Sequence, residues 1–422
     1  MTDRNSPHAA SGERLGAGSR APLLPLALVV ALFFLWGVAN NLNDVLIAHF
    51  KGLFTLSDFE AGLVQSAFYL GYFCLAIPAA LFMRRFGYRA AVLLGLCLYG
   101  IGALLFWPAA GLASYPAFLL ALFVIASGLG FLETSANPLI ARMGDEASAA
   151  RRLNLAQAFN PLGSIVGVLI GRAFILSDTG DHSATAVQGP YLAIGLGVFL
   201  WALLIRLVRF PPVATARDAD EGVGAAGDFR AVLRRRQVLL GIAAQFFYVG
   251  AQVGVWSFLI RYAEVAVPGT APRAASDYLT ASLVLFMAGR FAGAMLMGRV
   301  APRRLLALFA AIGGACCLFA TLAGGHAGVL ALVASSFFMS IMYPTIFAES
   351  VHGLGGLTKS ASALLVMAII GGAVFPALMG LVSDASGTIV RAMSVPAVCF
   401  AVVLAFALAP RGAARSSASP DA

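Results

Sequence analysis

The sequence predicts an all-α membrane protein with twelve transmembrane helices in two six-helix bundles. Its 422 residues are 60% hydrophobic and 11% charged, with a mean hydropathy of +0.89. Soluble domains are about 45–50% apolar and about 25% charged. Apolar stretches of about 20 residues, long enough to cross a bilayer, follow one another with short polar breaks. The longest interior break falls near the middle of the chain, which predicts two halves.

The spans can be placed in order from these apolar runs. The first six are expected at 23–50, 58–82, 89–109, 115–141, 153–177 and 189–209, and the second six at 237–264, 277–300, 303–323, 327–350, 359–383 and 389–410. The division predicts an N-terminal bundle at 23–209, a cytoplasmic linker at 210–236 and a C-terminal bundle at 237–410. The cytoplasmic tails are expected at 1–22 and 411–422. The first apolar run is too long for a signal peptide, so we expect it to be retained as a helix.

The distribution of Lys and Arg predicts the orientation. Cytoplasmic loops of membrane proteins carry an excess of basic residues. With both termini in the cytoplasm, 22 of the 28 basic residues lie on the cytoplasmic side and 4 on the other, leaving Arg172 and Arg290 inside spans. The net charge of +9 therefore reflects topology and not nucleic-acid binding. We expect a multi-pass protein of the bacterial cytoplasmic (inner) membrane.

A weak internal repeat supports the division into halves. Ser57-Asp58-Phe59 opens the second predicted span and Ser276-Asp277-Tyr278 opens the eighth, and 27 residues after each Ser comes an Arg pair, Arg84-Arg85 and Arg303-Arg304. Two parallel six-helix halves resemble the major facilitator architecture. The Arg-rich loop 84–89 resembles the signature loop of that superfamily, but lacks its usual Asp.

The first span carries a cluster of polar residues in its second half. Asn40, Asn41 and Asp44 share one face of the predicted helix, with Asn43 beside Asn40. A carboxylate near the bilayer centre costs about 2.5–3.5 kcal/mol even on lenient insertion scales, so Asp44 must face protein or water. The structural alternative is that these amides join neighbouring helices.

The fourth span places a second acid inside the membrane. Glu133 and Asn137 are at i and i+4, and Pro138 frees a backbone carbonyl near the same face. The structural alternative is that Glu133 pairs with a buried Arg, for which Arg172 and Arg290 are the intramembrane choices. The remaining acids of the second half lie at helix ends, which predicts that proton chemistry belongs to the N-terminal half.

The fifth span opens with the polar residues Asn154, Gln157 and Asn160 at three-residue spacing. The small residues that follow at four-residue spacing predict close packing and not a ligand site: Gly163, Gly167 and Gly171.

The seventh span mixes amides and aromatic rings on one face. Its members are Gln245, Tyr248, Gln252 and Trp256. Such a mixture suits a sugar, because amides bond hydroxyls while rings stack on C–H faces. The structural alternative is a helix interface with aromatic rings near the lipid headgroups. Weaker signals of the same kind are Gln65, Tyr69, Tyr72 and Tyr343, the last beside a kink predicted at Pro344.

Several runs resemble the fucose–galactose–proton symporter family of the major facilitator superfamily. The resemblance covers nearly the whole chain except the tails and the linker. The runs that carry it are Asn40-Asn41-Leu42-Asn43-Asp44, Leu132-Glu133-Thr134-Ser135-Ala136-Asn137-Pro138, Leu153-Asn154-Leu155-Ala156-Gln157-Ala158-Phe159-Asn160, Gly250-Ala251-Gln252, Trp256-Ser257-Phe258-Leu259-Ile260-Arg261-Tyr262 and Tyr343-Pro344-Thr345-Ile346-Phe347.

This resemblance implies sugar:proton symport by alternating access, with L-fucose as the first expected sugar and galactose, glucose or N-acetylglucosamine as alternatives. It implies proton coupling at Asp44 and Glu133, with Glu133 also bordering the sugar site and with Asn41 and Gln157 near the sugar. We add further substrate-binding candidates: Asn137, Asn160, Gln252 and Trp256.

Other classes fit the residues less well. A drug/proton antiporter favours a large apolar cavity, whereas this interior is rich in amides, and a non-transporting sugar sensor needs a larger output domain than the linker and tails offer. No His/Cys/Asp catalytic grouping lies inside the spans, and the five cysteines lack metal spacing. We therefore expect no enzyme, cofactor or metal. The expected partners are sugar, proton and lipid bilayer, not nucleic acid, for a functional monomer.

Overall fold

The computed structural model describes residues 23–54, 58–174, 184–215, 225–270 and 272–410. These residues form helices with short connections and no strands. The N-terminal half contains α1 (Leu23–Leu53), α2 (Asp58–Gly111), α3 (Tyr115–Arg142), α4 (Ala149–Gln157), α5 (Phe159–Phe174) and α6 (Gln188–Leu207). The linker contributes two short helices, α7 (Pro212–Thr215) and α8 (Ala225–Leu233).

The C-terminal half is built in the same way. It contains α9 (Arg236–Ala266), α10 (Pro272–Leu296), α11 (Pro302–Ala323), α12 (Gly325–Met339), α13 (Met342–Val351), α14 (Thr358–Met367), α15 (Gly371–Ser386), α16 (Ile389–Ala392) and α17 (Ser394–Leu408). One-turn 3₁₀ helices join several of them, among which η4 (Ala368–Ile370) links α14 to α15.

The twelve expected spans are confirmed, although some of the breaks between helices differ from the positions predicted from the polar residues. Among the described residues, nine helices are long and apolar enough to cross a membrane. One of them, Ala67–Gly111, holds the second and third expected spans. The first and fifth spans, which are α1 and the α4–α5 pair, supply the other two. The described part of the chain is therefore that of a multi-pass membrane protein.

Three breaks differ from the expected positions. The loop expected at 84–89 is a bend at Gly87 alone, whose φ of 83° suits a residue without a Cβ. The fifth span starts earlier, at Ala149, and breaks at Ala158. The tenth span breaks at Ser340 and Ile341, ahead of the kink expected at Pro344, because a proline fits the first turn of a new helix better than a helix interior.

Glycines let α1 and α5 pack backbone to backbone. A Cβ on Gly163 would overlap the carbonyl oxygen of Phe34, and a Cβ on Gly37 would overlap that of Asn160. A Cβ on Gly167 would lie 2.6 Å from the carbonyl oxygen of Val38. Part of the small-residue track predicted in the fifth span is thus a packing surface, as expected, and it holds Asn160 at a fixed distance from α1.

We expect Gly163→Ala to destabilise the protein, because backbone on α1 cannot move aside as a flexible side chain can. Overpacking of this kind costs about 1–3 kcal/mol. Gly197→Ala on α6 is the matched control, since a Cβ there meets no described heavy atom within 4 Å. The melting temperature of the purified protein in detergent is the measurement. A Gly163→Ala protein that melts no lower than Gly197→Ala would contradict the packing argument.

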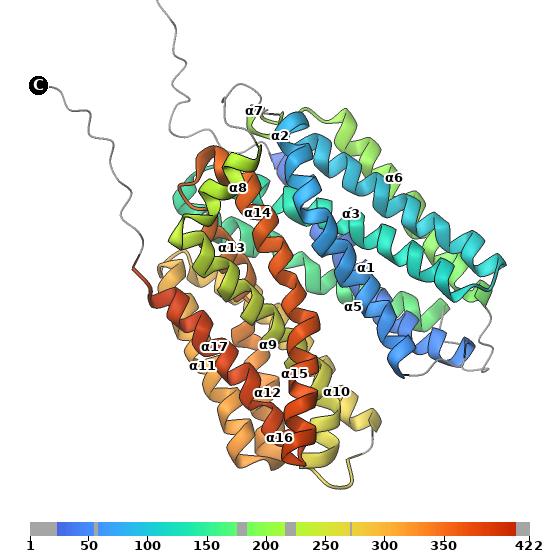
Figure 1. Cartoon of the computed structure of the whole chain (residues 1–422), viewed down its shortest axis with the longest axis vertical. Coiled ribbons are helices and arrows are strands. Elements are labelled where there is room, and N and C mark those ends of the chain that lie inside the picture. Colours follow the sequence, from blue (N-terminus) through green and yellow to red (C-terminus); the bar gives the residue numbers. More distant parts are fainter. Residues whose placement is uncertain (1–22, 55–57, 175–183, 216–224, 271, 411–422) are drawn as a thin grey trace, which may run out of the picture.

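The two halves touch mainly at one end of the molecule. We call this the linker end, because α7 and α8 lie there, and the opposite end the far end. Figure 1 shows the two groups of helices meeting at the linker end and diverging towards the far end. At the linker end α14 packs on α2 and α3, and α13 packs on α4.

Specific polar contacts hold the linker end together. The Glu146 Oε1 accepts a hydrogen bond of 2.7 Å from the backbone N–H of Gly353 and lies 3.4 Å from the Nδ1 of His352. The Nζ of Lys359 lies 5.2 Å from the centre of the Tyr88 ring. These contacts join segments of opposite halves, so the structure is a state closed at the linker end.

Candidate functional site

A cavity of about 500 Å³ lies between the two halves. This volume falls in the range of about 300–1,000 Å³ that is usual for small-molecule sites. Residues of both halves line it. The N-terminal half contributes Phe33, Trp36, Phe68, Tyr69, Tyr72, Glu133, Gln157, Asn160, Pro161 and Ser164, and the C-terminal half contributes Val249, Gln252, Val253, Trp256, Ser257, Ile260, Leu279, Leu283, Phe286, Arg290, Tyr343 and Ile369.

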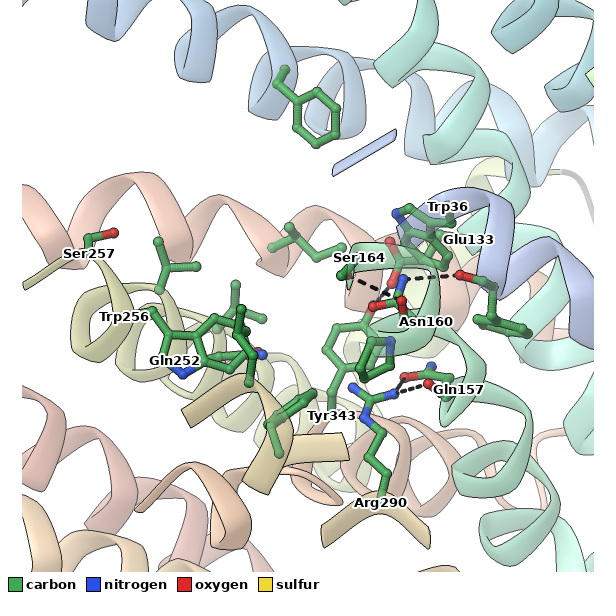
Figure 2. A pocket seen from close by; sticks show the side chains of 18 of the residues that line it. Trp36, Glu133, Gln157, Asn160, Ser164, Gln252, Trp256, Ser257, Arg290 and Tyr343 are labelled. Atoms are coloured by element: carbon green, nitrogen blue, oxygen red, sulfur yellow. Dashed lines mark hydrogen bonds between the residues drawn. The ribbon is translucent and has the colours of Figure 1, made fainter. Parts of the chain in front are cut away.

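Glu133 is the acid of this cavity. It projects from the middle of α3, and its side chain is 2% exposed. The Tyr343 hydroxyl, on α13 of the opposite half, donates a hydrogen bond to the Glu133 Oε1 (Figure 2). The amide of Asn137 lies one turn along α3, but its Nδ2 makes no hydrogen bond within the described part of the chain. An ionised carboxyl group that is buried away from water is costly unless it is paired.

Arg290 is the cation of the cavity, and it bridges the halves. Its Nη1 donates to the backbone carbonyl of Gln157 at 2.8 Å and to the Gln157 Oε1 at 2.9 Å (Figure 2). The break between α4 and α5 presents that carbonyl to the cavity. The guanidinium group also lies 4.8 Å from the centre of the Phe286 ring. Arg290 interacts electrostatically with Glu133, although no ion pair joins them among the described residues.

Gln157 bonds both to this cation and to the residue one turn from the acid. Its Nε2 donates a 3.0 Å hydrogen bond to the Oδ1 of Asn137, which is four residues from Glu133 on α3. Hydrogen bonds thus join Arg290 to Gln157 and Gln157 to Asn137, beside Glu133.

Aromatic rings form the other walls. On the N-terminal side the Trp36 ring stacks with Phe33 and with Tyr72. Its centre lies 5.8 Å from the centre of the Phe33 ring and 6.3 Å from that of the Tyr72 ring. On the C-terminal side the Trp256 Nε1 donates to the Ser336 Oγ at 3.1 Å, and its ring meets Phe286 edge to face. That hydrogen bond fixes the indole orientation. The cavity therefore offers two tryptophans and several amides, a lining typical of carbohydrate sites.

Most of the predicted site residues meet in this cavity. Five of them line it: Glu133, Gln157, Asn160, Gln252 and Trp256. Asn160 also donates from its Nδ2 to the Phe33 carbonyl at 3.2 Å. Asn137 is fully buried behind Gln157 and does not line the cavity. Asn41 and Asp44 belong to α1, but their side chains lie outside the described residues.

Neighbouring contacts bear on points that the sequence left open. Glu133 accepts a hydrogen bond from Tyr343, and no ion pair with an Arg joins it among the described residues. Tyr343, a weaker signal in the sequence, lines the cavity. The predicted face of the seventh span divides, because Gln252 and Trp256 reach the cavity while Gln245 and Tyr248 are fully buried.

Sequence reasoning did not place Arg290 and Tyr343 at the site. Arg290 carried a signal, since an intramembrane charge is a functional candidate by default. Its partner Gln157 is 133 residues away in the sequence, and Tyr343 is 210 residues from Glu133. The periodicity of a single helix cannot predict contacts between residues so far apart in the sequence. Among the described residues no group of three His, Cys, Asp or Glu side chains is placed to hold a metal.

Comparison with known proteins agrees with this architecture. Residues 26–362 match the family described as the Major Facilitator Superfamily. The chain is 46% identical over 409 residues to the L-fucose-proton symporter of Escherichia coli (strain K12), covering 92% of this chain and 93% of that protein. It is 37% identical over 391 residues to the glucose/galactose transporter of Brucella abortus, covering 91% of this chain and 93% of that protein.

A solved structure is similar throughout. The crystal structure of the Major Facilitator Superfamily transporter FucP in the outward conformation superposes with a TM-score of 0.83 at 46% identity, covering 91% of this chain and 97% of that chain. With the shared architecture of two six-helix halves and these relatives, the chain belongs to the fucose–galactose–proton symporter family of the Major Facilitator Superfamily.

Proposed function

We propose that this protein takes up a sugar together with protons, with L-fucose as its first substrate. The observation that carries the proposal is Glu133, a buried acid that lines an amide- and tryptophan-lined cavity between two halves. The relative named L-fucose-proton symporter supports the choice of sugar. The glucose/galactose transporter relative favours a second candidate, a symporter of galactose, glucose or a similar hexose.

The proposed mechanism uses the acids as proton carriers. Asp44 and Glu133 take up protons while the cavity is open at the far end. Protonated Glu133 then donates a hydrogen bond to a sugar hydroxyl, with Gln157, Asn160 and Asn41 as further partners. Loading of both ligands allows the two halves to rock, which opens the linker end. The proton gradient drives uptake because the two states differ in affinity for proton and sugar.

The excess of basic residues supports a cytoplasmic linker end. Contacts such as Glu146 with Gly353 then close the cytoplasmic side, and the state described here faces outward. We propose that the protein lies in the bacterial inner membrane as a monomer with both termini in the cytoplasm. The amide-lined cavity argues against a drug/proton antiporter, and the absence of enzymatic chemistry is part of the proposal.

A sugar panel in proteoliposomes tests the substrate. Each sugar is scored for counterflow and for alkalinisation of the external medium, measured together. We expect L-fucose to give both signals, and galactose or glucose to give them if the hexose candidate is correct. Export of a cationic dye without any sugar signal would contradict sugar symport.

We expect Asp44→Asn to abolish accumulation while sugar exchange survives. Asn resembles the protonated carboxyl group but cannot release a proton, so the proton gradient no longer drives the cycle. Sugar uptake by energised vesicles and counterflow by de-energised vesicles are the two measurements. An Asp44→Asn protein that still concentrates sugar against its gradient would remove Asp44 from the coupling mechanism.

A further inference from the structure

A second set of polar side chains lies beyond the cavity, towards the linker end. Asn154 of α4, Gln245 of α9 and Thr345 of α13 are all fully buried, and none lines the cavity. We call these three residues the buried polar band. Asn154 and Thr345 come from opposite halves and lie where these halves are in contact, and Gln245 lies on α9 of the C-terminal half.

The side-chain amide of Gln245 is buried without a hydrogen bond in the described part of the chain. Neither its Nε2 nor its Oε1 has a hydrogen-bond partner among the residues that the structure describes. A buried amide without partners destabilises the state that buries it. The Oδ1 of Asn154 likewise lacks a partner within the described part of the chain. A protein that used only this state would be more stable with apolar residues at these positions.

Helical spacing shows which way these residues face. Gln245 precedes Val249 and Gln252, which line the cavity, by four and seven residues, so it shares their face of α9. Asn154 precedes Gln157 by three residues and shares its face of the fifth span. Gln245 and Asn154 thus continue the cavity lining by one or two turns in the direction of the linker end.

Neighbouring contacts place Gln245 beside α13. Further towards the linker end, the Gln237 Nε2 on α9 donates to the Glu349 carbonyl at 2.6 Å. On the cavity side, the Tyr248 hydroxyl donates to the Met339 carbonyl at 3.0 Å. Gln245 lies between these two levels of α9, a helix that packs on α13.

Thr345 completes the band by joining the two halves. The Asn154 Nδ2 donates a 3.0 Å hydrogen bond to the Thr345 Oγ1, a contact between α4 and α13. Rocking that opens the linker end separates α4 from α13 and breaks this bond. Asn154, Thr345 and Gln245 would then face the widening gap with free donors and acceptors.

We propose that the buried polar band is a second sugar-binding subsite, which is formed only when the linker end opens and which receives the sugar on its way out. Amides and a hydroxyl on both sides of the gap fit the hydroxyl groups of a monosaccharide. The band is buried in the present state, so it does not change the affinity of the cavity for a sugar that enters from the far end. This inference rests on the proposed sugar transport.

The decisive variant is Gln245→Leu, because it removes no hydrogen bond of the present state and keeps a similar volume. L-Fucose transport is measured in membrane vesicles of the two orientations, with sugar presented to either face. We expect the half-saturating concentration at the linker face to rise roughly fivefold, the effect of losing one hydrogen bond. The value at the far face should stay unchanged. Gln252→Leu should weaken binding at both faces, because Gln252 lines the cavity.

Equal effects of Gln245→Leu at both faces, or no effect at either, would overturn the subsite. A second measurement needs no sugar. Gln245→Cys is treated with a hydrophilic maleimide from the linker face, and Ala244→Cys, about 100° round the same helix and equally buried, is the control. We expect labelling at 245 and not at 244.

Failure of the two ideas gives different results. If wild-type vesicles do not transport L-fucose, the choice of substrate fails, and labelling at 245 still tests whether the band opens. If wild-type vesicles transport L-fucose and Gln245→Cys stays as unreactive as Ala244→Cys, the subsite is wrong while the transport function stands.

Discussion

Glu133→Gln is expected to exchange sugar across the membrane but to lose both accumulation and the movement of protons. The Gln side chain keeps a carbonyl oxygen for the Tyr343 hydroxyl and an N–H group that can donate to a sugar, as the protonated acid does. It cannot release a proton, so sugar and proton movements separate. Counterflow, sugar-dependent alkalinisation and the steady-state accumulation ratio are measured on the same proteoliposomes.

Two further variants make this expectation specific to the acid. Tyr343→Phe removes the hydrogen bond from Tyr343 to Glu133 but leaves the carboxyl group. This variant should therefore still couple sugar to protons. Glu133→Ala leaves the Tyr343 hydroxyl buried without a partner at a cost of about 1–3 kcal/mol, which should weaken transport roughly 5- to 150-fold. Coupled accumulation by Glu133→Gln would show that Glu133 is not a proton carrier.

The spans could be predicted because each depends on local sequence. About 20 apolar residues between polar breaks are sufficient to place a helix in a bilayer, and each of the twelve predicted spans has described helices close to the expected bounds. The helix breaks could not be predicted equally well. At Gly87 a single residue turns the chain although the polar residues around it extend further. At Ala158 the helix breaks before Pro161, as the tenth span breaks before Pro344, so each proline lies just after its break and does not mark the exact position.

The candidate site divides in the same way. Glu133 could be identified from sequence because a carboxyl group in the membrane is costly wherever it lies. Its link to Tyr343 could not, because it depends on how two halves dock. Helix-face arguments failed for Gln245 and Asn137 for a related reason. Both share a face with cavity residues, but the depth at which a helix leaves the cavity depends on the packing of its neighbours.

The docking of the halves also brings two cavity residues of one half against predicted site residues of the other. Tyr343 and Arg290 belong to the C-terminal half, and each donates to a predicted site residue of the N-terminal half. The cavity is therefore lined by residues that also form contacts between the halves. A sugar that competes for Gln157 or Glu133 directly alters the contacts between the halves, which is one way for substrate binding to permit rocking.

Arg290→Met is expected to lower sugar uptake strongly. Met has similar length but no donor, so the two contacts with Gln157 disappear together. Hydrogen bonds from a charged group contribute about 1.5–3 kcal/mol, and loss of even one should lower uptake at subsaturating sugar at least tenfold. Lys at this position should restore only part of the activity, because an ammonium group does not reproduce the planar guanidinium fork.

Arg261→Met is the matched control for this loss. Arg261 also lies over an aromatic ring, at 4.5 Å from the centre of Phe258, but it is exposed on α9 and does not line the cavity. The Arg261→Met variant should take up sugar at a rate close to that of the wild type. If Arg290 acts through closure of the linker end, Arg290→Met should also speed maleimide labelling of Gln245→Cys. Slower uptake without faster labelling would instead assign Arg290 to sugar binding alone, and wild-type uptake would exclude both roles.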